Sequence, residues 1–308
     1  IPAGAQAVIS EEFCRAEGST VFCFNTAEPD RNVLHRGTDV RSKDPVAVRG
    51  DRLTPARLGL IAASGYGAVR VFRMPRAAVI ATGDEVIAPG LPLPPGKLYA
   101  SNMVEIGAWL SMHGIPFETA VIPDREQEIQ EAVQSRLDGT DVFITSGGAW
   151  GSEKDLILKV VADMGWTGVY HRVRMGPGKP VGFGLLQGRP FFVLPGGPPS
   201  NEMAFLQLCL PALMKMTGAE SYLLPTVCAR LSDRVSGERG WTEFVHARLE
   251  TSPAGRVATP IRLKSRLKSM AEKEALIVIP EDRDAIPAGE TIAVQVMRST
   301  ADAAGAAS

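Results

Sequence analysis

Short apolar runs and amphipathic stretches alternate through the middle of the chain, from residue 75 to residue 217. The runs at residues 77–82, 117–122, 141–145 and 190–194 are predicted strands, and the one at 141–145 is typical of a parallel strand buried on both faces. Stretches with helical periodicity follow each run, at residues 103–113, 125–137, 156–164 and 201–216. This alternation predicts an α/β domain built on a doubly wound parallel sheet with right-handed crossovers.

The two flanks show a different pattern, with short β-type runs and little helix. Before residue 74 such runs lie at residues 7–9, 20–24 and 32–40, and Thr54 and Pro55 then open a short helix. After residue 218 they lie at residues 222–231, 242–249, 275–279 and 290–296. We therefore expect three domains: a β-rich module at residues 1–74, the α/β domain at residues 75–217, and a small β-barrel with a disordered tail at residues 218–308.

Composition narrows the class of protein. A net charge of -1 argues against binding to nucleic acid or to a membrane surface by bulk electrostatics. The apolar runs fall short of the roughly 18 residues of a membrane span. The cysteines are scattered and read as reduced thiols of a cytoplasmic protein; they are Cys14, Cys23, Cys209 and Cys228. Because the first residue is Ile1 and the sequence there already reads as the inside of a domain, we expect that an N-terminal portion is missing.

Three predicted strands end in loops of small or acidic residues, at residues 82–85, 146–155 and 195–200. In open α/β sheets, ligands bind across the carboxyl ends of the strands. Gly147 and Gly148 allow the backbone to pass close to a ligand, and the helix that follows offers free N–H groups to an anion. One Gly-rich turn alone would fit a tight connection equally well, but three such loops at one edge favour a ligand site.

The charged residues of these loops suggest a phosphate and a metal. Lys179 lies in a stiff Gly-Pro-Gly-Lys-Pro stretch and suits a phosphate, although a solvated turn lysine is the alternative. Asp84, Glu85 and Asp155 would repel that phosphate unless a divalent cation of the Mg²⁺ type lay between them. The alternative for Glu85 and Asp155 is charge compensation at a helix N-terminus, worth only about 0.3–1 kcal/mol.

Taken in order and spacing, these motifs resemble the molybdopterin molybdenumtransferase family, which includes bacterial MoeA and the E domain of gephyrin. The resemblance covers essentially the whole chain, and the ordered set is specific where any one motif would be weak. It implies an enzyme that takes adenylylated molybdopterin and molybdate as substrates, cleaves the adenylate with the help of Mg²⁺, and releases AMP. It also implies a homodimer, and it leaves open a partnership with the molybdopterin adenylyltransferase.

The resemblance carries roles to individual positions. It implies that Glu85 and Asp155 hold the metal or orient water, and that Asp39 is an acidic residue of the cleft. The residues implied to bind the pterin are Thr82, Gly83, Asp84, Ser101, Asn102, Thr145, Ser146, Gly147, Gly148, Lys179, Pro180, Pro195, Gly196, Ser200 and Ser265.

Two departures from the family pattern remove positive charge. Gly176 stands where many members carry a lysine, and Trp241 stands where many carry an arginine. Arg239, Lys264 or Arg266 could compensate. The basic stretch at residues 262–269 fits either an oxyanion site or a solvated strand edge.

Other functions stay open at this point. One is the adenylyltransferase that makes adenylylated molybdopterin, although that enzyme is usually a lone α/β domain. Another is a non-catalytic pterin-binding or scaffolding protein, an alternative that the weakened set of cations keeps open.

Overall fold

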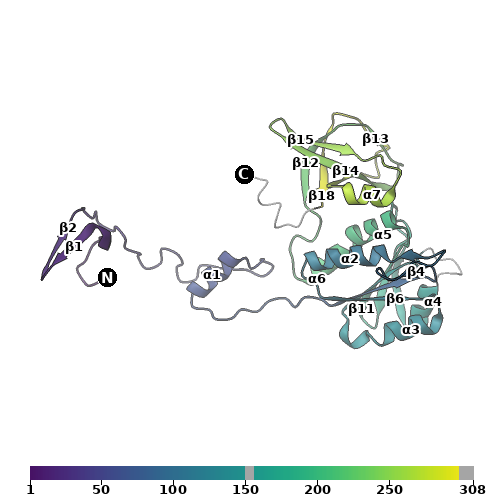
Figure 1. The fold of residues 1–308 in the computed structure, drawn as a ribbon, viewed down its shortest axis with the longest axis horizontal. Helices are drawn as coiled ribbons and strands as arrows, with labels where there is room; N and C mark the ends of the chain where they lie inside the picture. The colour runs from purple at the N-terminus through teal and green to yellow at the C-terminus, as the bar shows by residue number, and fades with distance from the viewer. Residues whose placement is uncertain (150–155, 298–308) are drawn as a thin grey trace. The chain divides into compact units, whose positions relative to one another are not determined.

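The computed structural model describes residues 1–149 and 156–297. The predicted disordered tail and the candidate Asp155 lie outside these residues. The chain forms two compact units, Ile1–Arg70 and Val71–Ser308, which we describe separately (Figure 1). The domain boundaries at residues 74 and 217 stay predictions.

The first unit contains one hairpin and one helix. Strands β1 (Cys14–Glu17) and β2 (Thr20–Cys23) pair antiparallel after the 3-10 turn η1 (Glu11–Phe13). Helix α1 (Pro55–Ala63) starts as predicted, with the Thr54 hydroxyl accepting a hydrogen bond from the Arg57 amide. The strands predicted at residues 7–9 and 32–40 do not form, because this part of the chain turns back on itself. Asp30 and Asn32 have positive φ, and the Val8 amide bonds to the Arg31 carbonyl.

The second unit is built on a six-stranded sheet in the order β6-β3-β7-β11-β10-β8. Its strands are β3 (Ala77–Thr82), β6 (Phe117–Ile122), β7 (Val142–Ser146), β8 (Trp166–His171), β10 (Gly182–Leu186) and β11 (Arg189–Leu194). The first four in this spatial order are parallel, as predicted, whereas β10 runs antiparallel to both of its neighbours, β11 and β8. The prediction of a wholly parallel sheet is therefore wrong at this edge. The cause is the two-residue turn at Gln187 and Gly188, both with positive φ, which makes β10 and β11 a hairpin.

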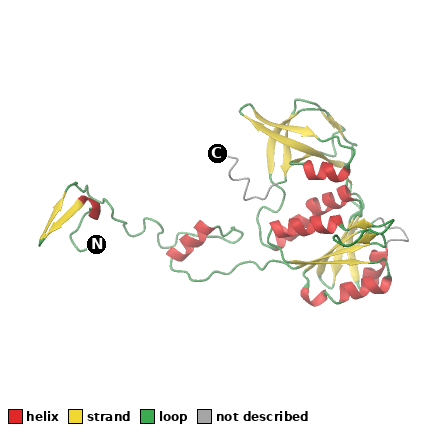
Figure 2. Cartoon of the chain, in the orientation of Figure 1, coloured by secondary structure: helices red, strands yellow, loops and turns green. Residues whose placement is uncertain are grey.

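Helices cover both faces of this sheet (Figures 1 and 2). They are α2 (Ser101–Met112), α3 (Glu126–Gln134), α4 (Leu156–Asp163), α5 (Pro198–Ala204) and α6 (Leu210–Met216), with a 3-10 turn η2 (Leu137–Gly139) and a π-helical turn η3 (Phe205–Cys209). Successive residues of β3 belong to opposite cores, since Val79 packs with α2, α5 and α6 and Ile80 packs with α3 and α4. The carboxyl ends of β3, β7 and β11 are therefore held by packing on both sides.

A five-stranded barrel follows in the chain. Its strands are β12 (Thr226–Leu231), β14 (Thr242–Ser252), β15 (Gly255–Pro260), β16 (Ala275–Ile279) and β18 (Thr291–Val296). The order β15-β12-β18-β16-β14 closes because β15 also pairs with β14. Shorter elements are β13 (Val235–Ser236) with β17 (Ala285–Ile286), β4 (Val86–Ile87) with β5 (Leu98–Tyr99), and helix α7 (Arg266–Glu272). The barrel sheet also includes β9 (Met175–Gly176), which pairs with β14 although it lies between β8 and β10 in the sequence.

Across residues 1–149 and 156–297, none of the helices has the length and apolar character needed to cross a membrane.

Candidate functional site

The loops after β7 and β11 and the helices α2 and α5 are joined by hydrogen bonds around Ser146, the last residue of β7. Its hydroxyl accepts from Nδ2 of Asn102 in α2 and from Nδ2 of Asn201 in α5, each at 3.1 Å. The same amides donate to the carbonyls of Gly196 at 2.9 Å and Pro195 at 2.8 Å, in the loop after β11. Ser146, Asn102 and Asn201 are 7%, 8% and 1% exposed. We call these three residues the serine–asparagine node.

The glycine loop after β7 is pressed against its neighbours. Gly147 has φ of +114°, and a Cβ there would lie 2.8 Å from the Thr82 carbonyl oxygen. Gly148 has φ of +70°, and a Cβ there would lie 2.5 Å from Cγ2 of Ile157. The Gly147 amide donates to the Leu194 carbonyl at 3.0 Å. Side chains are therefore excluded at both glycines, and the backbone of the loop lies directly on the end of β3.

The acidic loop after β3 presents its carboxylates to solvent beside this backbone. A Cβ at Gly83 would lie 2.7 Å from Oε2 of Glu85, so the Glu85 carboxylate folds over Gly83. Asp84 Oδ1 accepts from the Asp124 amide at 3.3 Å, and the Asp84 carbonyl accepts from Lys97 Nζ. Carboxylate oxygens are the donor chemistry that a hard cation such as Mg²⁺ takes.

Within the described residues, however, no group of three His, Cys, Asp or Glu side chains could hold a metal. The second carboxylate expected to hold the metal, Asp155, lies outside those residues. The metal roles of Glu85 and Asp155 therefore stay predictions.

Lys179 is exposed and lies against the indole of Trp241, with Nζ 4.9 Å from the ring centroid. A cation over the face of a tryptophan is attracted by the ring quadrupole. The backbone of this loop is fixed as well, because the Lys179 carbonyl accepts from the Val173 amide at 3.1 Å. Trp241 stands where many family members carry an arginine, and in this chain its ring contacts the cation of Lys179.

The other departure, Gly176, lies beside an acidic side chain. A Cβ at Gly176 would be 3.5 Å from Cγ of Glu243, which is ordinary van der Waals contact. The proposed compensating cations Arg239, Lys264 and Arg266 are exposed, and their role stays a prediction.

Ser265 lies at the start of a helix. Residues 262–265 form a loop and residues 266–269 are the first turn of α7, so the interpretation of this stretch as a strand edge is wrong. The Ser265 hydroxyl caps that helix by accepting from the Lys268 amide at 3.4 Å. As the N-cap, Ser265 satisfies one of the first amides of α7, which has no partner inside the helix.

The structure brings some of the predicted residues together and leaves others apart. Thr82, Gly147, Ser146, Pro195, Gly196 and Asn102 are linked by the contacts given above. Ser101 is exposed at the start of α2, Ser200 lies in the first turn of α5, and Pro180 and Thr145 are buried. Asp39 is exposed in a turn of the first unit. The binding roles of all these residues stay predictions.

Asn201 is the residue that sequence reasoning missed. It follows directly after the Pro-Gly-Gly-Pro-Pro-Ser stretch, inside the first turn of a helix. An asparagine next to a Gly-Pro turn is a signal for side-chain bonding to loop carbonyls, and it could have suggested this role.

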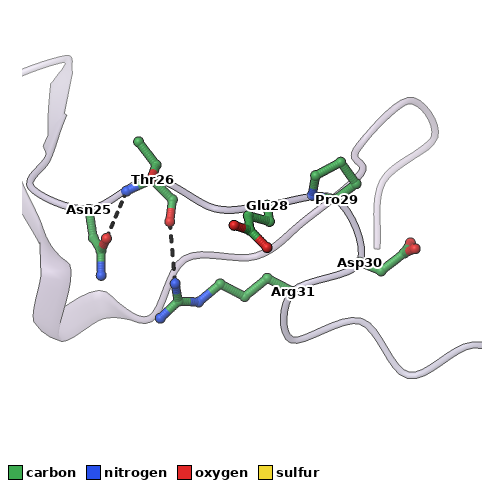
Figure 3. Close-up of a pocket in the computed structure, with 6 residues that line it drawn as sticks. All are labelled: Asn25, Thr26, Glu28, Pro29, Asp30 and Arg31. Carbon is green, nitrogen blue, oxygen red and sulfur yellow. Dashed lines mark hydrogen bonds between the residues drawn. The ribbon is translucent and has the colours of Figure 1, made fainter.

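A separate hollow lies in the first unit (Figure 3). It measures about 440 Å³ and is lined by Asn25, Thr26, Glu28, Pro29, Asp30 and Arg31. Arg31 Nη1 donates to the Thr26 carbonyl at 3.3 Å, and Asp30 Oδ1 is 2.9 Å from Nε2 of His35. Because its charged groups bond to neighbouring residues, this hollow is a weaker candidate than the strand-end loops.

Three family profiles match the chain in succession. Residues 1–65 match the MoeA N-terminal region (domain I and II), residues 78–215 match the "probable molybdopterin binding domain", and residues 228–297 match the MoeA C-terminal region (domain IV). The matched segments cover the hairpin unit, the α/β sheet with the serine–asparagine node, and the barrel. Fold and site thus define a protein of molybdenum cofactor biosynthesis with a molybdopterin-binding domain.

Known relatives agree in sequence and in structure. The chain is 28% identical over 306 residues to the molybdopterin molybdenumtransferase of Haemophilus influenzae, covering 96% of this chain and 74% of that one. It is 29% identical over 300 residues to molybdopterin molybdenumtransferase 2 of Mycobacterium tuberculosis, with the same coverage. The crystal structure of a molybdopterin biosynthesis MoeA protein from Pyrococcus horikoshii superposes with a TM-score of 0.78 at 28% identity, over 97% of this chain and 74% of that one. The chain belongs to the MoeA family of molybdopterin molybdenumtransferases.

Proposed function

We propose that the strand-end loops around the serine–asparagine node bind the pterin and phosphate of adenylylated molybdopterin. The observation that carries this proposal is the convergence of the loops after β7 and β11 on Ser146, with α2 bonded to both. Because Gly147 and Gly148 exclude side chains, the loop backbone can face a ligand directly. Lys179, fixed at the backbone and exposed at Nζ, supplies a cation for the phosphate.

The reaction that fits this site is transfer of molybdenum from molybdate to molybdopterin, with cleavage of the adenylate and release of AMP. Mg²⁺ would supply electrophilic assistance when bound, and the exposed Glu85 carboxylate would hold it together with Asp155. The loops keep the phosphate beside the carboxylates, and the node keeps the loops in register. We further propose that the protein acts in the cytoplasm as a homodimer. The role of Asp39 stays a prediction.

The direct test is to incubate the full chain with adenylylated molybdopterin, Mg²⁺ and molybdate, and to follow AMP release. Glu85→Gln keeps the size of the side chain and removes its charge, so it should suppress AMP release far more than it weakens molybdopterin binding. Glu128→Gln is the matched control, because Glu128 is partly exposed on α3 and pairs only with Arg125, 3.0 Å away, among the contacts described. Equal dependence of turnover on Mg²⁺ in wild type and Glu85→Gln would remove Glu85 from the metal site.

A second function is favoured by the charges near Lys179. Glu243 beside Gly176 and the indole of Trp241 make this part of the site less cationic than the resemblance to the family leads us to expect. A protein that binds molybdopterin without inserting the metal would fit that observation. Molybdopterin binding without AMP release, under the conditions above, would select this function.

A further inference from the structure

Four titratable side chains lie where α2 and α5 meet the barrel, three of them largely buried and one, Glu105, partly buried. They are Glu105 on α2, Glu202 on α5, His246 on β14 and Lys273 immediately after α7, and we call them the buried charge cluster. The side chains of Glu202, Lys273 and His246 are 1%, 6% and 11% exposed. Charged groups are rarely buried to this degree unless they are paired, so their arrangement needs a physical account.

Glu202 is the centre of the cluster. Its Oε1 accepts a hydrogen bond from Lys273 Nζ, which also donates to the Met270 carbonyl at 3.0 Å. Its Oε2 lies 3.6 Å from Nε2 of His246 and makes no hydrogen bond within the described residues, and Glu105 is near enough to interact with this carboxylate electrostatically. The carboxylate is therefore contacted from α2, from the end of α7 and from the barrel strand β14.

The protonation states of the two carboxyl groups differ. Burial, together with the nearby carboxylate of Glu202, raises the pKa of Glu105 to about 9. Burial also opposes the charge of Glu202, but His246, Glu105 and Lys273 outweigh it and lower the pKa of Glu202. At neutral pH a protonated Glu105 thus lies beside an ionised Glu202 that is paired with Lys273.

The cluster adjoins the node on two helices. Glu105 lies three residues after Asn102 on α2, which is the same helix face one turn further on. Glu202 directly follows Asn201 on α5. Lys273 ends α7, the helix that Ser265 begins. The cluster therefore connects the helices that carry the two asparagines of the node to the basic stretch at residues 262–269.

We propose that Glu202 and Lys273 are positioning residues that hold α7 and the loop at residues 262–265 in one fixed arrangement against α5. A buried ion pair adds little net stability compared with an apolar pair of similar size, but only one geometry satisfies it. The pair then sets which barrel residues face the pterin loops. The expected effect on molybdopterin binding rests on the proposed function. The expected effect on the position of α7 rests on the buried charge cluster alone.

The test uses four variants of the full chain. Glu202→Gln leaves Lys273 buried without its charge partner, and the double variant Glu202→Met with Lys273→Met replaces the pair by apolar side chains. Glu105→Gln keeps a neutral hydrogen-bonding group. Glu272→Gln is the matched control, because Glu272 lies on α7 and forms a more exposed ion pair with Arg248 of β14. For each variant we would measure the dissociation constant for molybdopterin, the thermal midpoint, and hydrogen exchange of the peptide at residues 261–272.

Glu202→Gln should weaken molybdopterin binding about tenfold and speed exchange at residues 261–272, whereas Glu105→Gln and Glu272→Gln should stay within about twofold of wild type at pH 7. The double methionine variant should regain the thermal midpoint but not the affinity. Recovery of both would reduce the pair to a purely structural role and overturn the proposal. If wild type itself does not bind molybdopterin, the proposed function fails, and hydrogen exchange decides alone: unchanged exchange in Glu202→Gln then refutes the positioning role.

Discussion

Replacing Asn201 by alanine should destabilise the second unit more than any exposed amide substitution. The Asn201 amide donates two hydrogen bonds, to Ser146 Oγ at 3.1 Å and to the Pro195 carbonyl at 2.8 Å, and the residue is 1% exposed. Each neutral bond contributes about 1 kcal/mol net, and a buried acceptor left without its donor costs about 1–3 kcal/mol. We therefore expect Asn201→Ala to cost about 2–4 kcal/mol.

The magnitude follows from the geometry, and a graded series checks it. Ser146→Ala removes one shared acceptor but leaves each asparagine its carbonyl partner, so it should cost about 1–2 kcal/mol. Gln127→Ala on α3 is the control, because its exposed amide donates only to Glu131 Oε1 at 2.8 Å among the contacts described, and it should stay within about 0.5 kcal/mol.

Thermal melts of the three variants provide the assay. At about 2–4 °C per kcal/mol for a unit of this size, Asn201→Ala should lower the midpoint by about 4–16 °C. Titration with molybdopterin should show weaker binding in the same variant. If Asn201→Ala melts no lower than Gln127→Ala, the node does not hold the loops together, and the argument for the site loses its basis.

Three further predictions use other groups. Lys179→Ala should weaken molybdopterin binding by about 1.5–3 kcal/mol. Trp241→Phe keeps an aromatic face beside the lysine and should change binding little. An unchanged dissociation constant for Lys179→Ala would exclude Lys179 from the binding site. Since the folded-state pKa of Glu105 is raised to about 9, its contribution to stability is fully present below the ordinary carboxyl pKa and is lost as pH rises through about 9. Melts between about pH 5 and pH 10 should therefore fall less steeply for Glu105→Gln, and parallel curves would contradict this assignment. Cys14 and Cys23 are directly opposite in the hairpin, with their sulfurs 3.7 Å apart. Oxidised glutathione should therefore convert them to a disulfide and be reduced to two molecules of glutathione, and the mass of the protein should fall by two hydrogens. A mixed glutathione adduct alone would count against this pairing.

The strongest sequence signals came from strands buried on both faces. β3 and β16 begin and end at the predicted residues, and so does β6, although its residues are exposed or only partly buried. In β3 and β16, continuous apolar runs bounded by polar or turn residues leave little choice of structure. The carboxyl ends of β3, β7 and β11 could therefore be predicted as one edge, and with them most of the loops of the candidate site.

What the sequence could not reveal depends on contacts between distant segments. β8 and β10 were missed because β8 is half exposed and β10 has glycine at alternate positions, so neither shows a clear apolar period. The node could not be predicted, because an amide that bonds two loop carbonyls depends on how closely the loops approach. For the same reason Trp241 was interpreted as a lost charge, whereas its position beside Lys179 gives it a partner.

Because the short strand β9 pairs with β14 of the barrel, no single cut in the chain separates the barrel from the α/β sheet with all of their strands intact. Met175, which is 6% exposed, pairs with Thr242 of β14, yet the chain returns to the α/β sheet immediately afterwards to form β10. A fragment that stops at residue 217 would keep β9 but lose the strand it pairs with. It would also lose the indole that contacts Lys179. In evolution, such a barrel cannot be exchanged by recombination at a single linker, since a new barrel would have to accept the β9 strand of its host.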